Sequence, residues 1–153
     1  IRTNNTALTQ TVYEEGGGTN GLYLGIDADR VHLATRNGGA GSQQNAFQTF
    51  TDTGAFHYVA VVFEAGEIRL HLDDNTPEVV STGYAAVSGH SGEPGVGRSP
   101  DGHAAGNFTT DYFDGDMDEI RMSNVARSRD WLTAEYLSVS DSFISYGEEQ
   151  IYE

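Results

Sequence analysis

The chain of 153 residues contains no cysteine, no lysine and only 3 prolines. The lack of cysteine excludes disulfide bonds, thiolate metal sites and cysteine catalysis. A chain of this length forms one domain, with a core large enough to be stable without disulfides. No apolar run approaches the roughly 20 residues that a membrane-spanning helix needs, so we expect no insertion into a membrane.

Positive charge is also scarce. Eight arginines face 23 aspartates and glutamates, which gives a formal net charge of -15 at pH 7. Such a chain repels the phosphates of nucleic acids and anionic membrane surfaces, so neither is an expected partner. The acidic excess suits a soluble protein that is extracellular or lies at the cell surface.

Glycine, by contrast, is abundant, with 19 residues. The glycines cluster between short runs in which apolar and polar residues alternate, a pattern typical of an all-β fold with many turns. Residues 21–36 predict a β-hairpin, and the nearly continuous apolar run 56–63 predicts a central strand buried on both faces. The predicted strands are residues 11–14, 22–26, 31–35, 47–50, 56–63, 68–72, 78–82, 95–97, 112–122 and 143–146.

A single short helix is predicted near the C-terminus. Ser128 has the side chain of a helix N-cap, and Trp131, Leu132 and Tyr136 form an apolar stripe that favours a place for Trp131 in the core. These elements predict an all-β fold, a two-sheet antiparallel jelly-roll sandwich with one short helix near the C-terminus. We expect one domain over residues 1–150, followed by a tail of residues 151–153.

The most specific stretch of the chain, residues 112–128, places several carboxylates close together. Hard oxygen donors of this kind suit Ca²⁺, although the spacing is not that of an EF-hand. The candidate metal ligands are Asp114, Asp116 and Asp118. In the alternative interpretation Asp114 and Asp116 form a turn and Asp118 accepts backbone hydrogen bonds, because carboxylate clusters are frequent in acidic proteins without a metal.

Candidate ligand-binding residues follow from strand periodicity. They alternate with apolar residues and are therefore expected to point away from the core: Arg30, His32, Arg69, His71 and Arg121. If their strands share one sheet, the outer face of that sheet gathers arginine and histidine, and Arg forks suit the sulfate or carboxylate groups of acidic polysaccharides. The alternative is an ordinary solvated face with cross-strand ion pairs.

Three stretches resemble, in this order, the laminin G-like (concanavalin A-like) jelly-roll superfamily: residues 21–33, 56–73 and 113–128. The last is the most diagnostic, because it holds the glycine, hydrophobic residue, Asp-Glu, aliphatic residue and Arg of the family's closing signature, followed by Ala-Arg-Ser. The resemblance covers residues 11–149 and implies a jelly-roll fold and, at Asp118 alone, a structural calcium ion. Family members carry further strands before the position of Ile1, so the resemblance also implies missing first strands and an exposed sheet edge.

In function, the resemblance implies a non-catalytic extracellular recognition module that binds a polysaccharide or a cell-surface protein. A second hypothesis is a structural subunit of an extracellular fibre or surface layer that self-associates by strand exchange at the exposed edge. A glycoside hydrolase is the least favoured, because the alternating carboxylates Asp114, Asp116 and Asp118 straddle a turn at Gly115. The histidines show neither metal-ligand spacing nor a neighbouring nucleophile, so we predict no active site.

Overall fold

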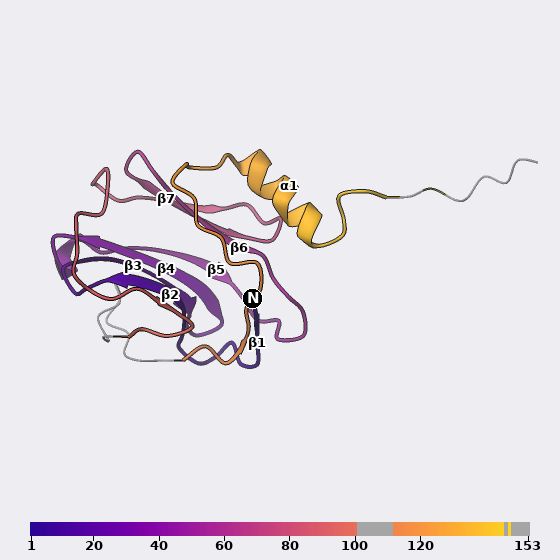
Figure 1. Cartoon of the computed structure of the whole chain (residues 1–153), viewed down its shortest axis with the longest axis horizontal. Coiled ribbons are helices and arrows are strands. Elements are labelled where there is room, and N and C mark those ends of the chain that lie inside the picture. The colour runs from indigo at the N-terminus through magenta and orange to yellow at the C-terminus, as the bar shows by residue number, and fades with distance from the viewer. Residues whose placement is uncertain (101–111, 146, 148–153) are drawn as a thin grey trace, which may run out of the picture.

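The computed structural model describes residues 1–100, 112–145 and 147 of the chain. Two larger antiparallel sheets face each other, and one helix lies over the smaller of them (Figure 1). The elements are β1 (Arg2–Thr3), β2 (Gln10–Gly16), β3 (Asn20–Ile26), β4 (Arg30–Asn37), the 3-10 turn η1 (Ala40–Ser42), β5 (Gln44–Thr49), β6 (Val59–Glu64), β7 (Glu67–Leu72), β8 (Glu78–Ser81), β9 (Gly95–Val96), β10 (Gly115–Asp116) and α1 (Arg129–Val139).

The larger sheet has five strands in the order β5-β4-β3-β2-β9. Its β3–β4 hairpin confirms the one predicted over residues 21–36, with Ile26 paired to Val31. Ala28 and Asp29 at the tip have φ angles of 48° and 62°, the positive values of a two-residue type I′ turn. That turn matches the twist of the strands and fixes a register in which Val31 and Leu33 are fully buried.

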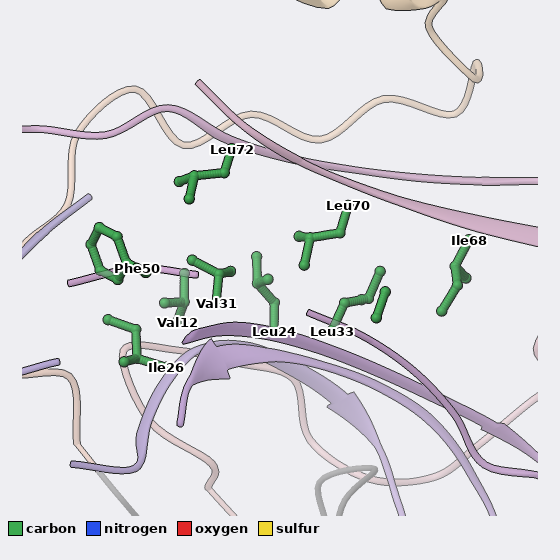
Figure 2. Close-up of a cluster of buried hydrophobic side chains, with 10 residues drawn as sticks. Val12, Leu24, Ile26, Val31, Leu33, Phe50, Ile68, Leu70 and Leu72 are labelled. Atoms are coloured by element: carbon green, nitrogen blue, oxygen red, sulfur yellow. The ribbon is translucent and has the colours of Figure 1, made fainter. Parts of the chain in front are cut away.

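The smaller sheet has three strands in the order β6-β7-β8. Ile68, Leu70 and Leu72 alternate along β7 as predicted, and all three point toward the larger sheet (Figure 2). The side chains that meet them come from the five-stranded sheet and the end of β5: Val12, Leu24, Ile26, Val31, Leu33 and Phe50. The predicted two-sheet sandwich with a single apolar core is therefore confirmed.

Helix α1 begins as predicted at Ser128, whose Oγ accepts a hydrogen bond from the Trp131 backbone N–H at 3.2 Å. It buries Leu132 against the three-stranded sheet, but Trp131 is 53% exposed, so the prediction of a core position for Trp131 is wrong. The Arg127 guanidinium lies 4.6 Å from the centre of the Trp131 ring. Among the residues that the structure describes, no helix is long and apolar enough to cross a membrane.

The strand predicted over residues 112–122 is wrong in most of its length. Only Gly115 and Asp116 form a strand, because they alone pair with the two residues of β1. Ile120 and Met122, expected to be buried, are 57% and 69% exposed. A strand needs backbone partners as well as an apolar pattern, and residues 117–127 make no backbone–backbone hydrogen bond to any described residue.

Two further strand predictions are corrected. Residues 143–145 form no strand, and Phe143 and Ile144 are about 60% exposed; Tyr146 of the same prediction lies outside the described residues. The run 56–63 forms a strand only from Val59, and Val62 is its one buried residue. The expectation that this strand is buried on both faces is wrong, because five of its six residues are half-buried or exposed.

Candidate functional site

The predicted arginine and histidine residues do not share one face. Arg30 and His32 lie on β4 of the five-stranded sheet, whereas Arg69 and His71 lie on β7 of the three-stranded sheet. Arg121 lies in the irregular segment before α1. The condition that their strands share one sheet is not met, because strand periodicity sets the face of a side chain and not the sheet to which its strand belongs.

Each of the three predicted arginines lies against a carboxylate. Arg30 is 3.4 Å from Asp27, and Arg69 is 2.8 Å from Glu64. Arg121 pairs with both Glu119 and Glu135. These contacts follow the alternative interpretation of a face with ion pairs, and they reduce the positive charge available to an acidic ligand.

His71 is 5% exposed and lies on the outer face of β7, the face that α1 covers (Figure 1). Burial lowers the pKa of His71, and the nearby positive charges of Arg129 and Arg69 lower it further. The imidazole is therefore neutral at pH 7, and in this arrangement it contributes to packing under the helix.

The outer face of β4 and β5 carries a continuous ladder of aromatic, amide and arginine side chains, which we call the β4–β5 ladder. The Arg30 guanidinium lies 4.3 Å from the centre of the Phe47 ring, and the His32 ring stacks on the Phe47 ring with 4.4 Å between their centres. The His32 Nε2 and the Gln43 Nε2 lie 3.0 Å and 2.8 Å from the Asn45 Oδ1. The members of the ladder are Arg30, His32, Arg36, Gln43, Asn45 and Phe47.

The register of the antiparallel pair builds this ladder. His32 pairs with Phe47 and Ala34 with Asn45, so these side chains share the face opposite to Val31 and Leu33. His32 itself is 4% exposed, and burial is the main cause of its lowered pKa, so it is neutral at pH 7.

The accessible part of the ladder belongs to the edge strand β5. Phe47, Asn45 and Gln43 are half-buried, as is Arg30 beside them. The Asn45 Oδ1 already accepts hydrogen bonds within the ladder, while its Nδ2 has no partner among the described residues. The partly exposed Phe47 side chain, which is covered by Arg30 and His32, supplies an apolar contact beside amide groups that can make directional hydrogen bonds, and a sugar uses both kinds of contact.

Sequence reasoning found Arg30 and His32 of this ladder but did not find Phe47 or Gln43. The available signal was the run Gln43-Gln44-Asn45-Ala46-Phe47, in which two amides and an aromatic residue occupy alternate positions around the buried Ala46. Because the pairing of this run with β4 is not visible in the sequence, its residues could not be joined to His32 beforehand.

The three candidate calcium ligands have separate partners. The Asp114 Oδ1 accepts from the Asn4 amide at 2.8 Å, and Asp116 pairs with Arg2 at 2.7 Å. The Asp118 Oδ1 accepts from the Glu119 backbone N–H at 2.8 Å. The described residues form no group of three or more His, Cys, Asp or Glu side chains that could hold a metal ion, and the calcium site at Asp118 stays a prediction.

The sheet order and the shared core define a jelly-roll β-sandwich. A comparison with protein-family models agrees, since residues 1–133 match the concanavalin A-like lectin/glucanases superfamily in its laminin G form. The chain belongs to this family, and the predicted resemblance is confirmed. No curated protein matches the chain.

One solved structure is similar, an S-layer domain-containing protein from Clostridium thermocellum. It is 14% identical, with a TM-score of 0.39, and the alignment covers 89% of this chain. The chain spans 66% of the length of that structure, just under two thirds.

Proposed function

We propose that this domain is a non-catalytic extracellular recognition module that binds carbohydrate through the β4–β5 ladder. Membership of the concanavalin A-like lectin/glucanases superfamily supports a carbohydrate-binding or adhesive module in general. The observation that carries the proposal is the half-exposed Phe47 ring beside the amides of Asn45 and Gln43 on an edge strand.

The chemistry of the ladder favours a neutral polysaccharide over an acidic one. Arg30 already lies against Asp27, so its charge is partly compensated. The chain as a whole carries a formal charge of -15, which repels sulfated or carboxylated chains at low ionic strength. Amide groups, in contrast, donate to and accept from sugar hydroxyls whatever the net charge.

Binding to neutral glucans, galactans and mannans in affinity gels and by calorimetry would test the proposal. Phe47→Ala is expected to weaken binding at least tenfold, and Asn45→Ala several-fold. Phe56→Ala is the matched control, because Phe56 is 51% exposed and lies under the Arg2 guanidinium much as Phe47 lies under Arg30. Retention that both Phe variants lose equally, or that neither loses, would contradict a site on the ladder.

A self-assembling subunit of a fibre or surface layer is the second candidate, and the observation in its favour is that β6 pairs on one side only among the described residues. Multi-angle light scattering across a hundredfold range of concentration tests it, and a constant monomer mass would argue against it. A glycoside hydrolase is the third candidate, for which reducing sugar released from any bound polysaccharide would be the positive result. We expect none, because the predicted carboxylates at 114–118 have separate protein partners.

A further inference from the structure

Residues 4–6 carry a modification motif in the loop between β1 and β2. The sequence Asn4-Asn5-Thr6 fits the acceptor motif for N-linked glycosylation, an asparagine followed two positions later by serine or threonine with no proline between them. The same motif occurs at residues 107–109, which lie outside the described residues. Because a motif of three residues is frequent by chance, the surroundings of Asn4 in the fold decide whether it can serve as an acceptor.

Asn4 is exposed at the surface of the domain. Its backbone N–H donates to the Asp114 carbonyl at 2.9 Å, and its side-chain Nδ2 donates to the Asp114 Oδ1 at 2.8 Å. These two bonds hold the exposed side chain in one place. A surface loop of this kind can carry a bulky glycan without displacing the atoms of the core.

The chemistry of the Asn4 amide allows both a glycan and the bond to Asp114. The Nδ2 of an asparagine carries two hydrogens, and the hydrogen bond to the Asp114 Oδ1 uses one of them. A sugar attached at Nδ2 replaces one hydrogen and leaves the other. The modified nitrogen can therefore still donate to Asp114, and the loop can keep its observed fold.

Thr6 supplies the third position of the motif, and in the folded chain it is covered. Since the motif accepts serine or threonine, the hydroxyl that these two side chains share is what it requires. Thr6 is 7% exposed, and its Oγ1 donates to the Asp29 Oδ1 at 2.6 Å. The Thr6 carbonyl also accepts from the Asp29 N–H at 2.8 Å. Transfer of a glycan to Asn4 must therefore precede the docking of this loop on the β3–β4 turn.

The order of the residues in the chain leaves time for this transfer. Asp29 follows Thr6 by 23 residues, and Asp114 follows Asn4 by 110 residues. At a synthesis rate of about 5–20 residues per second, Asp29 is added roughly 1–5 s after Thr6, and Asp114 roughly 5–20 s after Asn4. During these intervals both side chains of the motif are free of the partners that they have in the folded chain.

We propose that Asn4 is an N-glycosylation site that is modified while the chain is still unfolded. The donor is an oligosaccharide joined through a diphosphate to a membrane lipid. A bond forms between the Asn4 Nδ2 and C1 of the first sugar, and the bond between that C1 and the phosphate oxygen breaks. The lipid diphosphate leaves, and a base of the transferase takes one Nδ2 hydrogen as a proton. The proposal rests on the extracellular location that the proposed function includes, and it does not depend on ligand binding by the β4–β5 ladder.

The direct test is secretion of the full chain from a eukaryotic host, behind a cleavable signal peptide and with Asn107→Gln to remove the second motif. Because the chain has no lysine, trypsin cuts after Arg2 and Arg30 and releases residues 3–30, in which the motif at Asn4 is the only one. Mass spectrometry is expected to show a glycan on most copies of this peptide. Removal of the glycan by an amidase should convert Asn4 to aspartate, which marks the site.

Four variants in the same background test the motif. Asn4→Gln and Thr6→Val are expected to remove the glycan, because the first replaces the acceptor and the second keeps the shape of threonine without its hydroxyl. Thr6→Ser should keep the glycan. Asn5→Ser is the matched control, because the serine hydroxyl can replace the Asn5 Oδ1 that accepts from the Ala7 N–H at 2.9 Å, and the motif stays intact. An Asn4 that stays unmodified, or a glycan that persists in Thr6→Val, would overturn the proposal.

Cell-free translation of the full chain tests the order of events. A solubilised oligosaccharide transferase with its lipid-linked donor is added either at the start of translation or after the chain has folded. Late addition is expected to modify Asn4 at least tenfold less, and Asp29→Ala should reduce this difference because it frees the Thr6 hydroxyl. Equal modification at both times would contradict an unfolded acceptor. Carbohydrate binding is measured on unmodified chain from a bacterial host, so either proposal can fail without the other.

Discussion

The two sheets of the sandwich end in different kinds of edge. The five-stranded sheet ends in β5, whose sequence Gln-Asn-Ala-Phe-Gln-Thr is polar at most positions. The three-stranded sheet ends in β6, whose sequence is apolar at five of six positions. A polar edge strand is stable in water with one neighbour, whereas an apolar edge strand has the composition of a strand with two neighbours.

The two sheets also differ in how completely their strands are buried. In the five-stranded sheet β3 and β4 are buried along nearly their whole length. In the segments before and after α1, several apolar residues are largely exposed: Ile120, Met122, Val125, Phe143 and Ile144.

The largest expected contrast between the sheets is in the cost of a truncated core side chain. Leu33 on β4 is fully buried, and Leu33→Ala is expected to cost about 2–5 kcal/mol of unfolding free energy. Val61 on the half-buried β6 loses less contact, and Val61→Ala is expected to cost about 1 kcal/mol. Urea unfolding followed by tryptophan fluorescence measures both. Equal losses would mean that β6 is packed as tightly as β4.

A second prediction concerns the cost of adding a methyl group to a glycine of the five-stranded sheet. A Cβ at Gly25 would lie 2.3 Å from the Gln10 carbonyl oxygen and 2.0 Å from the Tyr23 hydroxyl, which itself donates to that carbonyl. Gly25→Ala is therefore expected to cost about 1–3 kcal/mol through overpacking. Gly41→Ala, where a Cβ meets nothing within 4 Å, is the control and should change stability by less than about 0.5 kcal/mol. A neutral Gly25→Ala would show that Tyr23 can move aside.

Periodicity and turn chemistry correctly predicted the β3–β4 hairpin of the five-stranded sheet. The alternation in residues 22–35 and the tight turn at Asp27 to Asp29 act locally, and the hairpin forms where both agree. The same reasoning failed at Ile120 and Met122. Their alternation is that of a strand, but hydrogen-bond partners for a strand come from distant parts of the chain, and a local pattern contains no information about them.

For the same reason, only part of the candidate site could be predicted from the sequence. The alternation of β4 places Arg30 and His32 on one face, and that face is where they lie. The pairing of β4 with β5, which brings Phe47 against His32, is a non-local contact. Exposure was also misjudged for His32 and His71, because the sequence does not show what covers an outer sheet face.

A smaller effect, shared by both sheets, is expected from pH. The pKa of His32 and the pKa of His71 are both lowered from 6.5, chiefly by burial. The unfolded chain then binds more protons than the folded one below pH 6.5, so stability is full above that pH and falls as the pH decreases toward the folded-state values. We expect a loss of roughly 1 kcal/mol between pH 7 and pH 5.5 in urea unfolding.

Single variants show which of the two histidines, and so which sheet, causes the loss of unfolding free energy at low pH. His32→Gln and His71→Gln should each flatten the pH profile, and the difference between them tells which outer face excludes water better. His90→Gln is the control, because His90 is exposed in a loop. A profile that remains steep in the double variant would assign the effect to other groups.

The last expected effect concerns calcium at Asp118. Asp118 lies in residues 117–127, which make no backbone–backbone hydrogen bond to any described residue, so an ion held there would stabilise this segment. At ten times its dissociation constant, calcium is expected to add about 1.4 kcal/mol to the unfolding free energy. Asp118→Asn should abolish that gain, whereas Asp130→Asn, an exposed aspartate on α1, should keep it. Identical unfolding curves in calcium and in chelator would show instead that Asp118 serves only to accept the Glu119 N–H.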